Sequence, residues 1–365
     1  MSITGRIAVL PAERDTLEIR EYAFGDPAPY QVIVRQYASG VCHSQLHEIH
    51  RARSAARLLG HESTGVVEAV GSAVRGVQPG DHVIACTSMY CGHCKQCLLG
   101  RPHLCTNRSA VRRPRGGRPR LSQGGDGLAQ FADLAGFAEV MLLHENAVVR
   151  IDDDIPLDRA ALVGCGVTTG MGAALNTARV APGSAVAVFG CGGVGVSVIQ
   201  GARIAGARQI IAVDVLPAKL DGARHFGATD TVLSGEEDPV RAIKKLSNGG
   251  VDYAFDAVGI PALTAQCFYS LAPRGVAVVV GAIPSGQKLE LEPGHFYVEK
   301  TITGSIMGSN RFQIDAPYYL DLYRQHKLDL DGMVSARLPL DGLDEAFAKM
   351  QAGEVTRSVI TFDGA

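Results

Sequence analysis

The stretch Ala185-Val-Ala-Val-Phe-Gly-Cys-Gly-Gly-Val-Gly195 decides the fold of the second part of this chain. Five apolar or small residues predict a short buried strand, and the glycines after them have the spacing G-x-G-x-x-G. A helical run begins at Val194, and Asp214 ends the next predicted strand about 20 residues further on. A turn with a capping aspartate would explain the glycines alone, but the complete unit predicts a dinucleotide site.

Each residue of this unit has a physical reason to be there. Gly190 permits the tight turn, Gly192 and Gly193 let a pyrophosphate approach the backbone, and Gly195 lets helix and strand pack closely. The helix N-terminus offers free N–H groups and a positive dipole end. Asp214 can accept hydrogen bonds from the adenosine ribose and would repel a 2′-phosphate, so the pattern favours NAD over NADP.

Outward from this stretch, the pattern divides the chain. Predicted strands and helices alternate over residues 184–281, which indicates a doubly wound parallel sheet of the α/β class. Residues 1–155 instead predict short strands with glycine turns, typical of an irregular barrel. The end of the chain returns to a mixed pattern, so we expect an inserted domain with the boundaries 1–166, 167–305 and 306–365.

Composition narrows the class of protein. The chain has 365 residues and a formal net charge of −2, which suggests neither nucleic acid nor an anionic membrane as a partner. Nine cysteines are an odd number, so reduced thiols in a cytoplasmic enzyme fit better than a disulfide framework. We expect no signal peptide and no transmembrane helix, because no apolar run approaches about 18 residues.

Four cysteines with the spacing C-x2-C-x2-C-x7-C predict a closed zinc site. They are Cys91, Cys94, Cys97 and Cys105, within a lobe at residues 86–107. A zinc ion with four thiolate ligands has no open position, so this site is expected to hold the lobe together and to do no chemistry.

Three scattered residues are candidates for a second zinc site. Cys42 lies in Gly-Val-Cys-His-Ser-Gln-Leu-His, His61 in Gly-His-Glu, and Cys165 in Gly-Cys-Gly-Val-Thr-Thr-Gly. A lone cysteine is usually a small buried hydrophobic residue, and spacing alone would not join the three. Two cysteines and one histidine with a fourth position open would be a catalytic arrangement.

With these motifs, the chain resembles the zinc-dependent medium-chain alcohol dehydrogenases over its whole length. The stretch GCGVTTGMGAALNTARVAPGSAVAVFGCGGVG is similar to the two-zinc, glutathione-dependent formaldehyde dehydrogenase branch. The resemblance implies a GroES-like irregular β-barrel catalytic domain with an inserted Rossmann doubly wound parallel sheet. It also implies two zinc ions per chain, NAD, a small alcohol or aldehyde as substrate, and a homodimer, with a tetramer as the alternative.

The resemblance implies roles for particular residues. Cys42, His61 and Cys165 resemble the catalytic zinc ligands, and Glu62 the carboxylate that can approach the metal. A proton relay would run from Ser44 through a nicotinamide-ribose hydroxyl to His47, while hydride passes between a zinc-bound alkoxide and NAD. The remaining expected contacts are all to NAD, and they are His43 and Arg357 at the pyrophosphate, Thr169 and Val194 at the nicotinamide, and Asp214 and Lys219 at the adenosine ribose.

Other functions stay open. A thiol-adduct formaldehyde dehydrogenase of glutathione or mycothiol type is the main rival, since the arginines between Arg108 and Arg120 could attract an anionic thiol cofactor. A solvated surface loop explains the same arginines more simply. A nicotinoprotein that retains its NAD, or an inactive binding protein with the same fold, would share these motifs.

Two departures from the family pattern stand out. Gln45 replaces the usual aspartate behind the ligand histidine, and we expect the neutral amide to make that histidine a weaker donor to zinc. The segment Ile49–Leu59 carries Arg51, Arg53 and Arg57, for which the sequence suggests no role.

Overall fold

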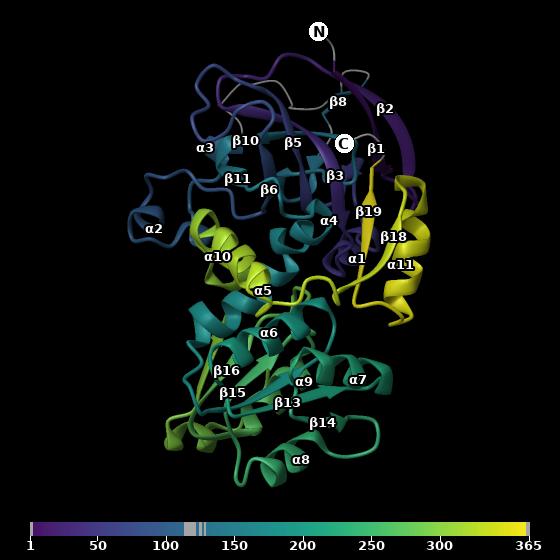
Figure 1. Ribbon diagram of the computed structural model, residues 1–365. Coiled ribbons are helices and arrows are strands. Elements are labelled where there is room, and N and C mark those ends of the chain that lie inside the picture. The colour runs from purple at the N-terminus through teal and green to yellow at the C-terminus, as the bar shows by residue number, and fades with distance from the viewer. Residues whose placement is uncertain (1–2, 113–121, 124–125, 128, 363–365) are drawn as a thin grey trace. The chain divides into compact units, whose positions relative to one another are not determined.

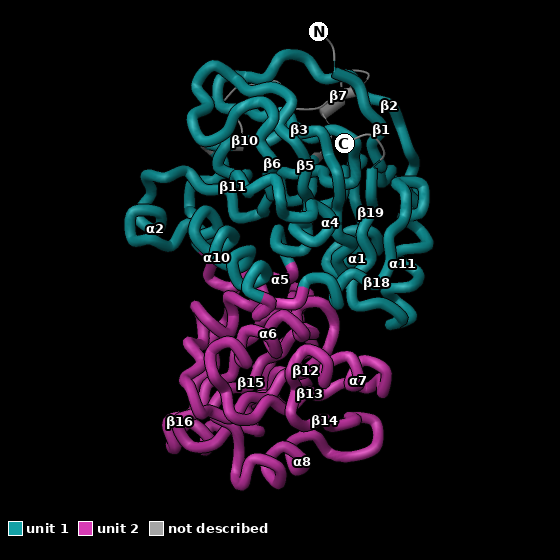
Figure 2. Tube along the Cα trace, viewed as in Figure 1, with its two compact units in different colours: residues 1–165, 311–325, 330–365 teal, residues 166–310, 326–329 magenta. Residues whose placement is uncertain are grey.

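The computed structural model describes residues 3–112, 122–123, 126–127 and 129–362 (Figure 1). The chain forms two compact units, coloured separately in Figure 2. Unit 1 comprises residues 1–165, 311–325 and 330–365, and unit 2 comprises residues 166–310 and 326–329. No helix among the described residues is both long enough and apolar enough to cross a membrane.

Unit 1 is built on a seven-stranded sheet that is mostly antiparallel. Its strand β3, buried along most of its length, lies in the middle and pairs with three neighbours. In spatial order the strands are β11 (Val148–Ile151), β6 (His82–Ala85), β5 (Glu62–Val70), β3 (Gln31–Gly40), β19 (Arg357–Thr361) and β18 (Val334–Leu338), while β10 (Val140–His144) also pairs with β3.

Two small sheets and short helices complete unit 1. The first small sheet has the order β2 (Glu18–Phe24), β1 (Ile3–Leu10), β4 (Arg57–Leu58) and β9 (Ala129–Gln130), and the second pairs β7 (Ser122–Gln123) with β8 (Asp126–Gly127). The α-helices are α1 (Ser44–Ile49), α2 (Lys95–Leu98), α3 (Ser109–Arg112), α4 (Leu157–Ala160), α10 (Phe312–Arg324) and α11 (Leu343–Gln351). Single 3-10 turns are η1 (Pro102–Leu104), η2 (Phe131–Asp133), η3 (Glu145–Ala147), η4 (Ala161–Gly164) and η8 (Leu340–Gly342).

Unit 2 is a parallel six-stranded sheet with flanking helices. Its order is β14 (Asp230–Leu233), β13 (Gln209–Asp214), β12 (Ala185–Phe189), β15 (Val251–Asp256), β16 (Leu271–Val279) and β17 (Thr301–Gly304). The helical elements are α5 (Gly166–Gly172), η5 (Ala173–Ala178), α6 (Gly193–Ile204), α7 (Pro217–Phe226), α8 (Pro239–Leu246), α9 (Pro261–Tyr269), η6 (Pro293–Val298) and η7 (Met307–Ser309).

This strand order confirms the doubly wound sheet expected from the sequence. Numbered along the chain, the strands lie in the order 3-2-1-4-5-6, so the winding reverses between β12 and β15. Ligands of such sheets bind beyond the carboxyl ends of the strands at this reversal. The strand β16 pairs with β15 from Leu271, opposite Val251, and the register shifts before Val276 pairs with Tyr253.

The segment between α1 and β4 is held by one buried arginine. The guanidinium of Arg53, whose side chain is 4% exposed, donates to the carbonyl oxygens of Pro11 at 2.7 Å and Ile49 at 2.6 Å. It also bonds the carbonyl oxygens of Glu48, Arg51 and Arg14 and the carboxylate of Asp15. Arg53 therefore ties residues 11–15 to the end of α1, which gives this part of the arginine-bearing segment a structural role.

We expect Arg53→Met to lower the free energy of unfolding by about 2–3 kcal/mol, because several carbonyl groups, three of them partly buried, lose their donor at once. Urea unfolding followed by fluorescence or circular dichroism measures this change. The matched control is Arg51→Met, whose side chain is 67% exposed and whose cost should stay within about 0.5 kcal/mol. Equal stability of the two variants would contradict the role assigned to Arg53.

Candidate active site

The register of three strands assembles the candidate site in unit 1. Gly40, the last residue of β3, pairs with Glu62 of β5 on one side and with Val359 of β19 on the other. Cys42 therefore follows β3 just where His61 precedes β5, and Arg357 enters beside both. Residues that lie far apart in sequence meet here because backbone hydrogen bonds fix their register.

Two glycines make room for this arrangement. A Cβ atom at Gly40 would lie 2.2 Å from Oε2 of Glu62, so the absence of a side chain at this position leaves space for the carboxylate. Gly60 has φ of +93°, and a Cβ there would lie 2.2 Å from the backbone nitrogen of Phe137. A side chain is therefore excluded at Gly60, which precedes His61, and at Gly40, which lies opposite Glu62 on the neighbouring strand.

Cys165 reaches the same place from the end of the 3-10 turn η4. Gly164 lies against β5 and β6, since a Cβ there would meet the carbonyl oxygen of Ala85 at 2.6 Å and the Cα atom of Glu62 at 3.4 Å. This close approach brings the Cys165 thiol to the residues that follow β3 and precede β5.

The resulting group of Cys42, His61, Glu62 and Cys165 fits a metal ion. All four are buried, and one ligand atom from each lies within 4.8 Å of the others. The hydrogen bond from Cys165, together with the charge of Arg357, holds the pKa of Cys42 well below its usual range. A thiolate, a second cysteine and an imidazole are the ligands that zinc prefers. The structure thus brings together the three predicted ligands and Glu62.

Arg357 lies within this group as its only buried cation among the described residues. Its Nη2 atom is 3.0 Å from Oε1 of Glu62, and the side chain is 5% exposed. Its Nη1 atom donates to the carbonyl oxygen of Val41. The guanidinium thereby offsets the negative charge of Glu62 and the cysteines. The contact of Arg357 with a pyrophosphate stays a prediction.

The imidazole of His61 is held on two sides. The ring of Phe131 packs edge-on against it, with ring centroids 5.3 Å apart. On the other side, Nε2 of Gln45 lies 2.9 Å from Nδ1 of His61, while Oε1 of Gln45 accepts from the backbone N–H of Gly60. Nδ1 is thus occupied by the amide, which leaves Nε2 for a metal. Neither contact follows from sequence spacing, because Phe131 and Gln45 belong to separate segments.

The expected relay residues lie on α1, which begins at Ser44, two residues after Cys42. The hydroxyl of Ser44 is 3.4 Å from the sulfur of Cys42 and is half-buried. His47 and His43 are exposed one turn apart, and their rings are 5.8 Å apart at the centroids. Ser44 is therefore close to a predicted zinc ligand, and both histidines reach solvent.

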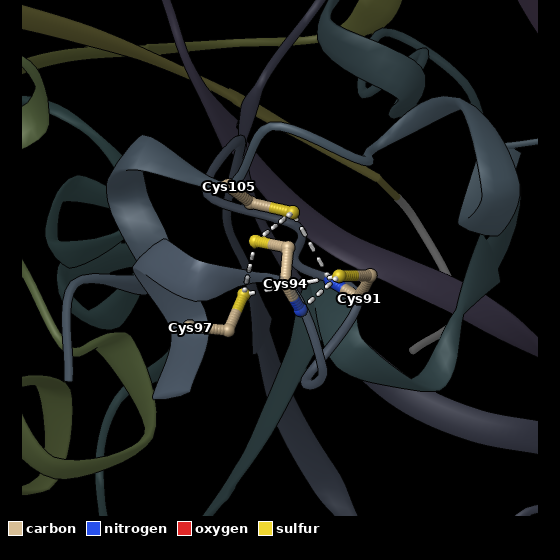
Figure 3. Close-up of side chains that lie close together, drawn as sticks. All are labelled: Cys91, Cys94, Cys97 and Cys105. Atoms are coloured by element: carbon tan, nitrogen blue, oxygen red, sulfur yellow. Dashed lines mark hydrogen bonds between the residues drawn. The ribbon is translucent and has the colours of Figure 1, made fainter. Parts of the chain in front are cut away.

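The second candidate metal group is the four-cysteine cluster shown in Figure 3. The sulfur of Cys94 is 3.5 Å from that of Cys97 and 3.9 Å from that of Cys105, and the sulfurs of Cys91 and Cys97 are 4.0 Å apart. Zinc–sulfur bonds of about 2.3 Å place tetrahedral ligands about 3.8 Å apart, so the cluster fits a zinc ion. Backbone N–H groups of Cys97 and Thr106 lower the pKa of Cys94 to about 5, which favours a thiolate.

The glycine-rich loop of unit 2 has the geometry expected of a phosphate cradle. Gly190 has φ of +89°, and a Cβ at Gly195 would lie 1.7 Å from the carbonyl oxygen of Gly190. By contrast, a Cβ at Gly192 would meet no atom within 4 Å, so a ligand has room to approach the backbone there. Gly192 caps the N-terminus of α6, whose first residue is Gly193.

Asp214 lies at the carboxyl end of β13, beside this loop. Its Oδ2 accepts from the backbone N–H of Cys191 at 2.8 Å, and its Oδ1 accepts from that of Leu216 at 3.0 Å. Lys219, in the first turn of α7, is half-buried. Burial and the charge of Asp214 raise the pKa of Cys191, whereas the charge of Lys219 lowers it. The carboxylate is thus fixed by the backbone, with further lone pairs left for a ligand.

Thr169 and Val194 are brought together by a close contact of helices α5 and α6. A Cβ at Gly170 would lie 2.4 Å from the carbonyl oxygen of Val194, so only glycine permits the two helices to approach this closely. The hydroxyl of Thr169 contacts the sulfur of Met307 at 3.6 Å. In the GCGVTTG motif, Gly170 thus permits close packing of two helices, and Gly164 permits the approach of Cys165 to the metal group.

The arginines to which the sequence assigned no definite role have different partners in the structure. Arg57 pairs with Glu48 at 3.1 Å, and Arg51 lies 3.6 Å from the same carboxylate. Arg108 donates to the carbonyl oxygen of His103 at 2.9 Å. Residues 113–121 and the side chain of Arg112 lie outside the described residues, and with them most of the arginine-rich segment proposed for an anionic cofactor.

Comparison with known proteins finds matches along the whole chain. Residues 28–153 match the alcohol dehydrogenase GroES-like domain family, and residues 193–323 match the zinc-binding dehydrogenase family. Alcohol dehydrogenase class-3 of Myxine glutinosa is 36% identical over 97% of both chains.

Solved structures of related dehydrogenases also match the whole chain. An alcohol dehydrogenase zinc-binding domain protein from Burkholderia ambifaria is 33% identical, with a TM-score of 0.94 and full coverage of both chains. Benzyl alcohol dehydrogenase from Acinetobacter calcoaceticus is 31% identical, with a TM-score of 0.91 over 99% of each chain.

The two metal groups predict two zinc ions per chain. We expect Cys97→Ala to contain one, and to lose about 2 kcal/mol or more of its free energy of unfolding, because a structural zinc contributes directly to folding. Elemental analysis and thermal unfolding measure both effects.

The matched control for this experiment is Cys86→Ala. Cys86 is a buried cysteine outside both groups, and burial raises its pKa to about 11, so it stays a thiol. Two zinc ions in the Cys97 variant, or a loss of zinc in the Cys86 variant, would refute the assignment.

Proposed function

Because this chain belongs to the zinc-dependent medium-chain alcohol dehydrogenase family, we propose that it transfers hydride between a small alcohol and NAD in a reaction centred on Cys42, His61 and Cys165. The family assignment makes it an oxidoreductase that acts on CH–OH groups. The buried cluster of two cysteines, one histidine and one glutamate is the observation that carries the proposal, since it unites the metal-ligand types of a catalytic zinc.

The bound zinc would act as a Lewis acid that lowers the pKa of the substrate hydroxyl. The chain's own residues would then bind and orient the substrate and remove its proton. Ser44, half-buried and next to Cys42, would accept the proton and pass it by way of a ribose hydroxyl to His47, which is exposed to solvent. Glu62 and Arg357 would keep the charge of the ligand set balanced.

The glycine-rich loop and Asp214 support NAD as the hydride acceptor. The open space at Gly192 and the N-terminus of α6 suit a pyrophosphate. The carboxylate of Asp214, held by the N–H groups of Cys191 and Leu216, would meet the adenosine ribose and repel a phosphate on it.

A thiol-adduct substrate is the second candidate. The relative from Myxine glutinosa, called a class-3 alcohol dehydrogenase, supports it, and so does the resemblance of the GCGVTTG stretch. The solved benzyl alcohol dehydrogenase supports an aryl alcohol instead.

We also propose that two chains associate through β17. This strand lies at the edge of the parallel sheet, and the preceding turn η6 exposes Phe296, Tyr297 and Val298 among the described residues. An unpaired strand edge next to exposed apolar side chains is a ready site for pairing with a second copy.

Cys42→Ser should lower turnover of alcohol with NAD about 10³-fold or more, because several kcal/mol of transition-state stabilisation depend on the metal. The dissociation constant for NAD, measured by fluorescence or calorimetry, should change little, since the glycine-rich loop and Asp214 lie in unit 2 and neither includes Cys42. Cys86→Ala is the matched control and should keep full turnover. Turnover of the Cys42 variant at the wild-type level would overturn the proposal.

The wild-type arm of this assay also separates the substrate candidates. Formaldehyde is tested with and without glutathione or mycothiol, and primary, aryl and terpenoid alcohols without thiol. Activity on formaldehyde only in the presence of a thiol would select the thiol-adduct reaction. Absorbance of the purified protein near the nicotinamide band would reveal retained cofactor.

Asp214→Ser should shift cofactor preference toward NADP. We expect the ratio of kcat/KM for NAD to that for NADP to fall about tenfold or more, since removal of the carboxylate removes both a ribose acceptor and the repulsion of a 2′-phosphate. Asp221→Ser, an exposed position on α7, is the control and should leave the ratio unchanged. An unaltered ratio in the Asp214 variant would exclude the proposed ribose contact.

Light scattering should give a mass twice the 38.5 kDa of one chain. Tyr297→Asp should shift this toward a single chain, because a charge would be buried without a partner at the interface. Tyr30→Asp alters an exposed tyrosine of unit 1 and should leave the mass unchanged. A single-chain mass for the wild type would rule out the dimer.

A further inference from the structure

One amide group behind the catalytic metal group has hydrogen-bonding partners that conflict. Gln45 is fully buried, its Oε1 atom lies 3.1 Å from the backbone nitrogen of Gly60, and its Nε2 atom lies 2.9 Å from Nδ1 of His61. A backbone N–H can only donate, so the atom of Gln45 that faces Gly60 must be the oxygen. The NH2 group of the amide therefore faces the imidazole.

This orientation selects one tautomer of His61. An amide NH2 group can only donate, so Nδ1 of His61 must accept and the ring proton must lie on Nε2. That proton then occupies the nitrogen that would bind the metal. The arrangement suits the metal-free chain, in which the N–H of Gly60 and one N–H of the amide each have an acceptor.

Metal binding requires the opposite tautomer. When the lone pair of Nε2 binds a metal, the neutral ring carries its proton on Nδ1 and needs an acceptor there. The amide as placed offers a donor at 2.9 Å. If the amide turned over, its oxygen would accept from Nδ1–H, but its NH2 group would then face the N–H of Gly60. One donor–donor contact stays buried in either orientation, at a cost comparable to that of a lost hydrogen bond.

We propose that Gln45 is a positioning residue that weakens the hold of the catalytic site on its zinc, and that a carboxylate in its place would tighten it. This inference rests on the proposed function, because it takes zinc to be bound by His61. A carboxylate has only acceptors and could serve both Gly60 and His61 at once. Glutamate has the length of glutamine, so Gln45→Glu tests the hydrogen bonding with little change of shape.

The test is loss of zinc from the fully loaded protein to a chromophoric chelator. The phase of zinc release that is absent in Cys42→Ser is assigned to the catalytic group. Release from the four-cysteine group serves as an internal reference. We expect Gln45→Glu to raise the zinc affinity of the catalytic group about tenfold or more, the scale on which groups behind metal ligands act. The affinity of the four-cysteine group should not change.

Gln45→Met separates this role from ordinary support of the ligand. Methionine matches glutamine in length but neither donates nor accepts strongly, so it removes the donor–donor contact and should not weaken zinc binding. If Gln45 simply supported His61, Gln45→Met would weaken binding about tenfold or more. That result, or unchanged or weaker binding in Gln45→Glu, would overturn the inference.

A spectroscopic measurement decides the point independently of these variants. In metal-free wild-type protein, the ¹⁵N spectrum of His61, assigned by its absence in His61→Asn, should show Nδ1 without a proton. A protonated Nδ1 would overturn the inference. A wild-type chain that bound zinc only at the four-cysteine group would instead contradict the proposed function, while the nitrogen spectrum would still decide the tautomer.

Discussion

The pairing of β3 with both β5 and β19 is the constraint on which the metal group depends. Gly40 is opposite Glu62 on one side and Val359 on the other, so the residues beyond these strand ends must lie together. A shift of one residue in either pair would turn the side chains of that strand to the opposite face. The backbone hydrogen bonds of these strand pairs therefore bring Cys42, His61 and Arg357 close together.

Glycines complete this arrangement by leaving space. Without a Cβ, Gly40 admits the carboxylate of Glu62, and Gly164 allows Cys165 to approach β5 and β6. Glycines also leave space in the loop of unit 2. Gly195 admits a carbonyl oxygen of the chain, whereas Gly192 leaves room for a ligand. In each case the requirement is the absence of a Cβ atom, and the group that fills the space is a carboxylate, a backbone segment or a ligand.

The sequence predicted those parts of the site that depend on residues close together in the chain. The cysteine ladder and the glycine-rich loop each depend on residues close in sequence, so their spacing was sufficient for a prediction of chemistry. Cys42, His61 and Cys165 were joined only by family resemblance, because strand register is not visible in spacing. The ion pair of Arg357 with Glu62 and the edge-on contact of Phe131 with His61 could not be predicted, since both depend on packing between separate segments. Gln45 was recognised as unusual, but its orientation depends on the N–H of Gly60, which has no sequence signal.

The two metal groups differ in how much of the chain they require. The ladder lies within residues 91–105, whereas the catalytic group needs residues 42 to 165 and the strand that begins at Arg357. During synthesis on a ribosome, the ladder could bind zinc soon after residue 105 emerges. The catalytic group would wait until β19 has been made and has paired with β3, near the end of translation. The four-cysteine group would therefore be complete before the group of Cys42, His61 and Cys165, because only the latter depends on a strand near the end of the chain.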